Sequence, residues 1–113
     1  MELERTVARM FCIGFDGYDL SAQTRRLVAR GVSSAALFGR NVHSPRQVAE
    51  LCGGLKSAAA GRSFLTCIDQ EGGRVRRLRD GFTHVPSMRA LGQTGDAGLA
   101  QDVGGCWRGN CGR

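Results

Sequence analysis

Short apolar runs alternate with amphipathic stretches along the first seventy residues. The runs are Met10–Phe15, Ala35–Phe38 and Phe64–Ile68, and polar or glycine residues follow each of them. A run of this length between turn residues is typical of a strand buried on both faces of a parallel sheet. We therefore expect three parallel strands, joined by right-handed crossovers.

Helical spacing predicts helices between these strands. Apolar side chains recur through residues 20–30 and stop at Gly31, a residue that favours the C-terminal end of a helix. A second helix is expected to start after Ser44, because Pro45 suits the first helical position and Gln47 completes a capping pattern. Gly61 is expected to close it, and a further helix begins near Asp96. The order βαβαβ indicates an α/β fold.

Polar residues follow each expected strand. Binding residues in parallel sheets collect at the carboxyl ends of the strands, so we expect the following to share one rim: Asp16, Arg40, Asn41 and the segment Asp69–Arg77. Asp69 and Glu71 do not suggest the acid and nucleophile of a glycosidase, because nothing nearby provides the environment of an acid catalyst. An ionised carboxylate at the end of a strand is better suited to accept hydrogen bonds from hydroxyl groups. A structural ion pair between Asp69 and Arg77 is the alternative.

The glycine, histidine and cysteine residues do not form recognisable nucleotide or metal sites. Gly72 and Gly73 belong to neither common nucleotide-binding pattern, and a tight turn is the simpler interpretation. His43 and His84 have no partners at metal-ligand spacing, and we expect both on the surface or rim. Buried thiols are expected where cysteines fall inside apolar segments, at Cys12, Cys52 and Cys67.

Composition narrows the class of protein. The chain has 113 residues and a net charge of +6, carried almost entirely by arginine. These arginines are dispersed, and aromatic residues do not alternate with the densest group, so we expect no nucleic-acid partner. The N-terminus lacks the pattern of a signal peptide and no apolar run reaches membrane-spanning length. We expect a soluble, cytoplasmic protein without a membrane partner.

Four motifs in this order resemble the opening of glycoside hydrolase family three: Ile13–Gly17, Leu37–Asn41, Asp69–Leu78 and Phe82–Pro86. The nearest branch is the cytoplasmic bacterial β-N-acetylhexosaminidases that recycle peptidoglycan. The resemblance implies the N-terminal βαβαβ portion of an incomplete (β/α)8 barrel of the TIM type. It also implies hydrolysis of terminal N-acetylglucosamine from peptidoglycan-derived muropeptides with retention, no metal or cofactor, and a monomeric full-length form.

The resemblance also suggests roles for two residues. By their positions in the motif, Asp69 would accept hydrogen bonds from hydroxyl groups of the terminal sugar, and Arg77 would contact the substrate as well. The histidine acid/base and the aspartate nucleophile of the family lie in later parts of the barrel. We therefore expect no catalytic residue in this chain and no hydrolysis by it alone.

A closed eight-stranded barrel needs roughly 250 residues. We expect residues 1–105 to be the N-terminal part of the barrel domain, with unpaired strand edges and an uncovered apolar face. Helical periodicity stops at Gly105. Because a shifted reading of the codons from there permits an amphipathic helix, we hypothesise a frameshift near Gly104 or Gly105, with residues 106–113 out of frame. Codon usage that excludes this helix would refute the hypothesis.

Two other functions remain open at this point. One is a non-catalytic βαβ remnant or sugar-binding module, which retains sugar contacts or docks a separately encoded remainder of the barrel. The other is an arginine-rich nucleic-acid binder, for which steeply salt-dependent DNA binding would be the test. Preference among N-acetylglucosamine, glucose and xylose is also open, because the residues that read the acetamido group lie downstream.

Overall fold

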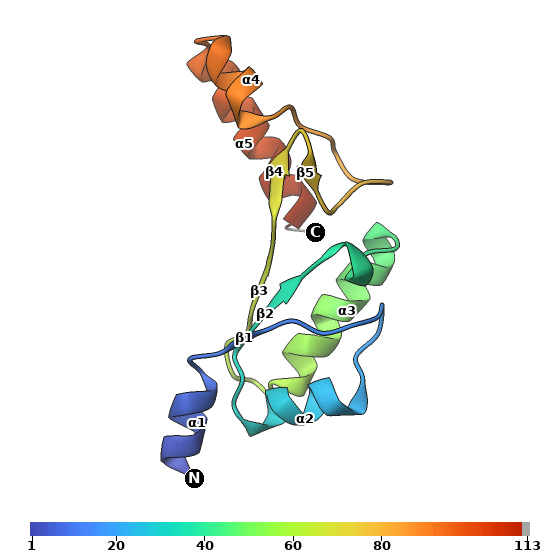
Figure 1. Cartoon of the computed structure of the whole chain (residues 1–113), viewed down its shortest axis with the longest axis vertical. Helices are drawn as coiled ribbons and strands as arrows, with labels where there is room; N and C mark the ends of the chain where they lie inside the picture. The colour runs from blue at the N-terminus through green and yellow to red at the C-terminus, as the bar shows by residue number, and fades with distance from the viewer. Residues whose placement is uncertain (112–113) are drawn as a thin grey trace. The chain divides into compact units, whose positions relative to one another are not determined.

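The computed structural model describes residues 1–111 and divides into two compact units, Met1–Ile68 and the part from Asp69 onward. The first unit holds a parallel sheet in the order β1-β2-β3, drawn in Figure 1. Its strands are β1 (Cys12–Ile13), β2 (Ser34–Leu37) and β3 (Leu65–Ile68), and the crossovers are α2 (Ala22–Arg30) and α3 (Pro45–Ala58). The predicted βαβαβ order is confirmed.

The helix ends follow the capping residues closely. The Ser21 hydroxyl accepts a hydrogen bond from the Thr24 N–H at 3.1 Å, and the Ser44 hydroxyl accepts one from the Gln47 N–H at 3.2 Å. These bonds satisfy N–H groups that have no partner within the helix. α3 ends at Ala58 rather than at Gly61, because Ala60 and Gly61 already adopt positive φ angles of 51° and 81°. A helix that the sequence did not predict, α1 (Glu2–Ala8), buries none of its residues.

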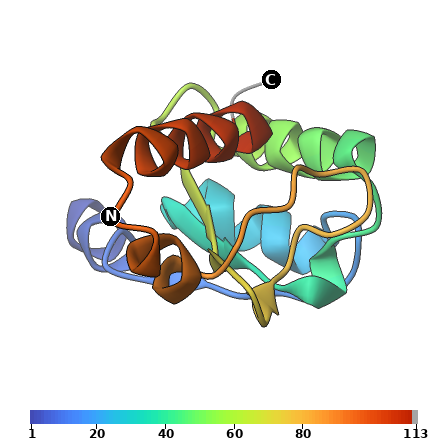
Figure 2. The same cartoon turned by 90° about the horizontal axis from the view of Figure 1, so that it is seen from above.

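One face of the sheet packs against α2 and α3. Strand pairing aligns Ile13 with Ala35 and Leu37 with Ile68, which puts these side chains on the same face. Ala35 there forms a core with Val28, Leu55 and Ala59, and Ile13 and Phe15 pack on its margin. The core of this unit therefore lies between the helices and a single sheet face, on which the two crossovers are seen in Figures 1 and 2.

Several side chains on the opposite sheet face are exposed, and here two sequence predictions were wrong. Cys12 and Cys67 are exposed rather than buried, and Cys52 on α3 is only partly buried. Strand side chains alternate between faces, so both strand cysteines fall on the face away from the helices. The strands are thus buried on one face, not two. Leu65 on the same face is 67% exposed, which confirms the expected uncovered apolar surface.

β1 is also shorter than the apolar run Met10–Phe15 suggested. Only Cys12 and Ile13 pair with β2. Beyond them, the Phe15 and Gly17 carbonyl oxygens accept hydrogen bonds from side chains instead of from a neighbouring strand. These backbone carbonyls have hydrogen-bond partners without strand pairing, so the strand ends early.

The second unit begins with a hairpin and ends with two helices. β4 (Gln70–Gly72) pairs antiparallel with β5 (Val75–Arg76), and α4 (Met88–Gln93) precedes α5 (Ala97–Cys111). α4 and α5 contact each other. Their common core is made by Val85, Leu91 and Val103, with Trp107 packed against it. No helix within residues 1–111 is both long and apolar enough to cross a membrane.

α5 continues where sequence periodicity predicted that it would stop. It passes Gly105 and extends to Cys111. Trp107 lies one helical turn after Val103 and packs on the same core, so the helix gains a contact that offsets its poor periodicity. The out-of-frame origin of residues 106–113 is a separate matter and stays a prediction.

Candidate functional site

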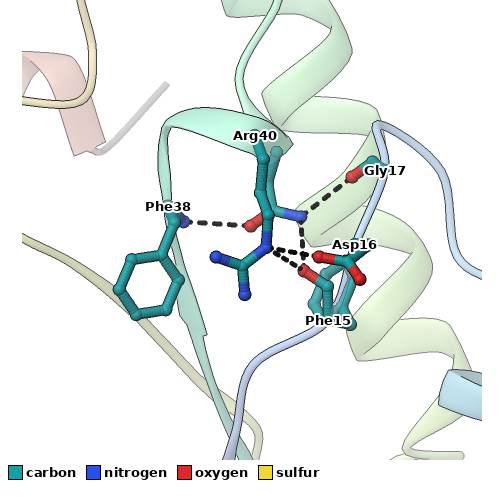
Figure 3. Close-up of polar contacts among 6 residues, drawn as sticks. Phe15, Asp16, Gly17, Phe38 and Arg40 are labelled. Carbon is teal, nitrogen blue, oxygen red and sulfur yellow. Dashed lines mark hydrogen bonds and ion pairs between the residues drawn. The ribbon is translucent and has the colours of Figure 1, made fainter.

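One buried side chain, Asn41, joins the carboxyl ends of β1 and β2. Its Nδ2 donates to the carbonyl oxygens of Phe15 at 3.0 Å and Gly17 at 2.9 Å. Its Oδ1 accepts from the N–H of Phe38 at 3.0 Å. Figure 3 shows these bonds running from the short 3-10 helix η1 (Gly39–Asn41) to the chain beyond β1. The amide therefore satisfies three backbone groups that no strand pairs.

Arg40 is held beside Asn41 by three contacts. Its Nε forms an ion pair with Asp16 Oδ1 at 2.6 Å and donates to the Phe15 carbonyl oxygen at 3.1 Å. Its guanidinium carbon lies 4.7 Å from the centre of the Phe38 ring, within range of a cation–π interaction. These contacts, also drawn in Figure 3, fix the orientation of an arginine whose side chain is 48% exposed.

Gln47 extends this network onto α3. Its Nε2 donates to the carbonyl oxygens of Tyr18 at 2.8 Å and Asn41 at 3.0 Å, and its Oε1 accepts from the His43 N–H. The sequence pattern indicated only a capping role for Gln47. In a capping box this side chain would bond to the backbone N–H of Ser44, but here it bonds to that of His43. Together with its bonds to Tyr18 and Asn41, it connects the loop after β1 to the loop after β2. His43 is exposed, as predicted, and its ring lies 5.4 Å from that of Tyr18.

The carboxyl end of β3 delivers the first predicted substrate contact. Ile68 pairs with Leu37, so β2 and β3 end at the same edge of the sheet. Asp69 is the next residue, and its side chain is exposed. Glu71 is exposed too, and it is the extra residue of a β-bulge between Gln70 and Gly72. The bulge removes Glu71 from regular alternation, and the interpretation that the two carboxylates are not a catalytic pair stays a prediction.

Gln70 fixes the hairpin that carries Arg77, and sequence analysis assigned it no role. Its Oε1 accepts from the N–H groups of Arg77 at 2.9 Å and Leu78 at 3.0 Å, while its Nε2 donates to the Leu78 carbonyl oxygen at 3.0 Å. A glutamine next to Asp69 was the available signal, because a partly buried amide needs several partners. The Gln70 side chain therefore connects β4 to the residues after β5 by hydrogen bonds.

Gly72 and Gly73 form the tight turn of this hairpin, as predicted. Both have positive φ angles, 79° and 57°. A side chain at Gly72 would overlap the carbonyl oxygen of Pro86, and one at Gly73 would come within 2.8 Å of the Ser87 Cβ. Glycine is required at both positions by the close approach of residues 85–87 as well as by the turn.

Arg77, the second predicted contact, is partly buried. Its Nε is shielded from solvent and has no hydrogen-bond partner within residues 1–111. Among those same residues, no ion pair joins Arg77 to Asp69, so the structural ion pair that sequence analysis left open is not observed. Buried donors are seldom left unsatisfied in folded proteins. The Nε of Arg77 is therefore an unsatisfied buried donor within the described residues.

The structure brings together part of the predicted rim. Asp16, Arg40 and Asn41 meet at the ends of β1 and β2, within the first unit. Asp69 and Arg77 belong to the hairpin that opens the second unit. In the described part of the chain, no three His, Cys, Asp or Glu side chains are grouped to hold a metal ion.

Known proteins of similar sequence are β-hexosaminidases. The chain is 45% identical over 84 residues to the β-hexosaminidase of Xanthomonas euvesicatoria pv. vesicatoria strain 85-10, covering 74% of this chain and 25% of that one. It is 44% identical over 96 residues to the β-hexosaminidase of Xanthomonas oryzae pv. oryzae strain KACC10331 / KXO85, covering 80% and 28%. The chain thus spans about a quarter of the length of these relatives.

Solved structures give the same result. A glycoside hydrolase family 3 β-N-acetylglucosaminidase from Paenibacillus sp. str. FPU-7 superposes with a TM-score of 0.83 at 40% identity, covering 88% of this chain and 20% of that one. NagZ from Neisseria gonorrhoeae, in complex with N-trifluoroacetyl-D-glucosamine, gives 0.67 at 28% identity, covering 74% and 25%. Residues 3–110 match the N-terminal domain of glycosyl hydrolase family 3, and the chain therefore belongs to this family, as an α/β segment of its barrel.

Proposed function

We propose that this chain is the N-terminal segment of a β-N-acetylhexosaminidase, in which Asp69 and Arg77 bind the terminal N-acetylglucosamine. The observation that supports this most strongly is the likeness to the Paenibacillus β-N-acetylglucosaminidase, at 40% identity over most of the chain. The exposed carboxylate of Asp69 agrees with it, and so does the charged side chain of Arg77, which is only partly buried. One group accepts from sugar hydroxyls and the other donates to sugar oxygens.

In this proposal the hairpin supplies binding and orientation rather than bond cleavage. Gln70 fixes the backbone at Arg77, and the turn at Gly72 and Gly73 fixes the approach of the two strands. The nucleophile and the acid/base would come from barrel segments that lie outside these residues, and the reaction would proceed with retention. The substrates would be muropeptides derived from peptidoglycan, and the full-length enzyme a cytoplasmic monomer without metal or cofactor.

A chimera tests the proposal directly. Residues 3–103 of this chain would replace the matching segment of the Xanthomonas euvesicatoria β-hexosaminidase, and release of a chromogen from an aryl N-acetylglucosaminide would be measured. We expect an active chimera, and we expect Asp69→Asn to lower kcat/KM by at least tenfold, since a charged hydrogen bond contributes about 1.5–3 kcal/mol. Asp80→Asn is the matched control, because Asp80 is an exposed aspartate after the hairpin.

Arg77 is tested in the same chimera. Arg77→Lys should raise KM, because lysine keeps the charge but loses the planar donor geometry. Arg74→Lys is the control, since Arg74 is exposed in the same hairpin. A soluble, folded chimera without activity, or an active one in which Asp69→Asn and Asp80→Asn behave alike, would contradict the proposal.

A further inference from the structure

We infer that Asp16 and Arg40 form a second contact pair, which binds neighbouring hydroxyl groups of an uncharged sugar unit. The inference rests on the proposed function for the class of ligand, a glycan. Asp16 is 92% exposed on its side chain, although its Oδ1 is held by Arg40. Asp16 lies three residues beyond the end of β1 and Arg40 three residues beyond the end of β2, at the sheet end where parallel sheets place their ligands.

The rigidity of the pair is its first unusual property. Exposed ion pairs contribute only about 0–1 kcal/mol to stability, so an ordinary one needs no further support. Arg40 nonetheless has the Phe15 carbonyl and the Phe38 ring as additional contacts, and Asn41 beside it is fully buried. Because Arg40 is already held in place, its side chain would lose less conformational entropy when it contacts a ligand.

The free atoms of the pair are its second property. Asp16 and Phe15 engage only the Nε of Arg40, and within residues 1–111 no hydrogen bond is made by its two Nη groups. A Cβ at Gly14 would lie 3.4 Å from Nη2 and 3.6 Å from the Phe38 ring, so the absence of a side chain there keeps space beneath the guanidinium. Donors of Arg40 and acceptor oxygens of Asp16 are thus presented side by side.

Charge then decides between possible ligands. The positive charge of Arg40 and the negative charge of Asp16 cancel, so an anion is repelled by one member of the pair and a cation by the other. A hydroxyl group both donates and accepts, and two neighbouring hydroxyls can bond to the carboxylate and the guanidinium at once. The pair therefore suits a neutral polyol, which in this family of proteins means a sugar ring.

The full 113-residue chain, labelled with 15N, allows the test by NMR titration with N-acetylglucosamine and N,N′-diacetylchitobiose. We expect the Arg40 Nε–H signal and the Gly17 and Gly39 amide signals to shift with the disaccharide. Asp16→Asn should weaken that binding roughly fivefold, as the loss of about one net hydrogen bond predicts. Glu50→Gln is the matched control, because Glu50 forms the exposed ion pair with Arg46 on α3.

The outcomes separate this inference from the proposed function. Shifts confined to the amides of residues 70–78 would leave the proposed function standing and overturn the Asp16–Arg40 contact. Larger shifts at Arg40 with sodium acetate than with the neutral disaccharide would overturn it as well.

If the isolated chain gives no dispersed spectrum, the chimera provides the second measurement. Arg40→Lys should there lower kcat/KM for the disaccharide at least threefold more than for an aryl N-acetylglucosaminide. Equal effects on the two substrates would refute the contact.

Discussion

Replacing Asn41 with alanine tests how the first unit holds the ends of β1 and β2 together. The side chain is fully buried and makes three hydrogen bonds, to Phe15, Gly17 and Phe38. Each is worth about 1 kcal/mol net, so Asn41→Ala should lower the free energy of unfolding by about 3 kcal/mol. This is a large share of the roughly 5–15 kcal/mol that stabilises a typical domain.

The assay is urea unfolding followed by circular dichroism, combined with hydrogen exchange of the peptides around residues 15–17 and 38–41. Asn41→Ala should lower the urea midpoint and speed exchange at the Phe38 amide, whose acceptor is lost. Arg46→Ala is the control. It removes an exposed ion pair with Glu50 and should cost less than about 1 kcal/mol.

A second variant distinguishes hydrogen bonding from packing. Asn41→Asp preserves the volume and the acceptor for the Phe38 amide, but it places an oxygen opposite the carbonyl oxygens of Phe15 and Gly17. We expect it to destabilise at least as much as alanine, because the donor is lost and a charge is buried. A stability equal to that of the unchanged chain would refute the role assigned to Asn41.

Three further predictions concern the hairpin, the glycines and the activity of the chain itself. Gln70→Ala should speed hydrogen exchange at the Arg77 and Leu78 amides, and Gln70→Glu should retain their protection because its oxygens can still accept; equal exchange in the two variants would contradict this. Gly72→Ala should lower the free energy of unfolding by at least about 1 kcal/mol. Gly53→Ala on α3 should raise it by about 0.5–1 kcal/mol, because a Cβ added there would meet no atom within 4 Å. Urea unfolding measures both. The purified 113-residue chain should not hydrolyse a chromogenic N-acetylglucosaminide, and turnover that Asp69→Ala abolishes would prove this wrong.

Local signals in the sequence predicted the fold of the first unit well. The cap at Ser44 and the apolar runs that end at Phe38 and Ile68 depend on interactions between residues close in sequence. Such interactions can be predicted from the sequence alone. The exposure of Cys12 and Cys67 could not be predicted in the same way. It depends on which elements cover the second face of the sheet, and an apolar run does not say whether one face or both are covered.

The hairpin and α5 show the same limit. β4 and β5 are too short to give a periodic signal, and their pairing depends on the turn at Gly72 and Gly73 together with the Gln70 side chain. α5 continues past Gly105 through a contact of Trp107 with Val103 and its neighbours, which appears only after folding. The motif residues Asp69 and Arg77 were therefore evident in the sequence, but the role of Gln70 in fixing the loop between them was not.

The polar side chains around these strand ends divide into two groups by chemistry. The amides of Asn41, Gln47 and Gln70 bond to backbone groups, and together they satisfy carbonyls and N–H groups that no strand pairs. The carboxylates of Asp16, Asp69 and Glu71 remain exposed. An amide both donates and accepts, so it can connect loops without adding charge, whereas an ionised carboxylate only accepts and is costly to bury. This division leaves the charged acceptors exposed to solvent, while the neutral amides connect backbone segments within each unit.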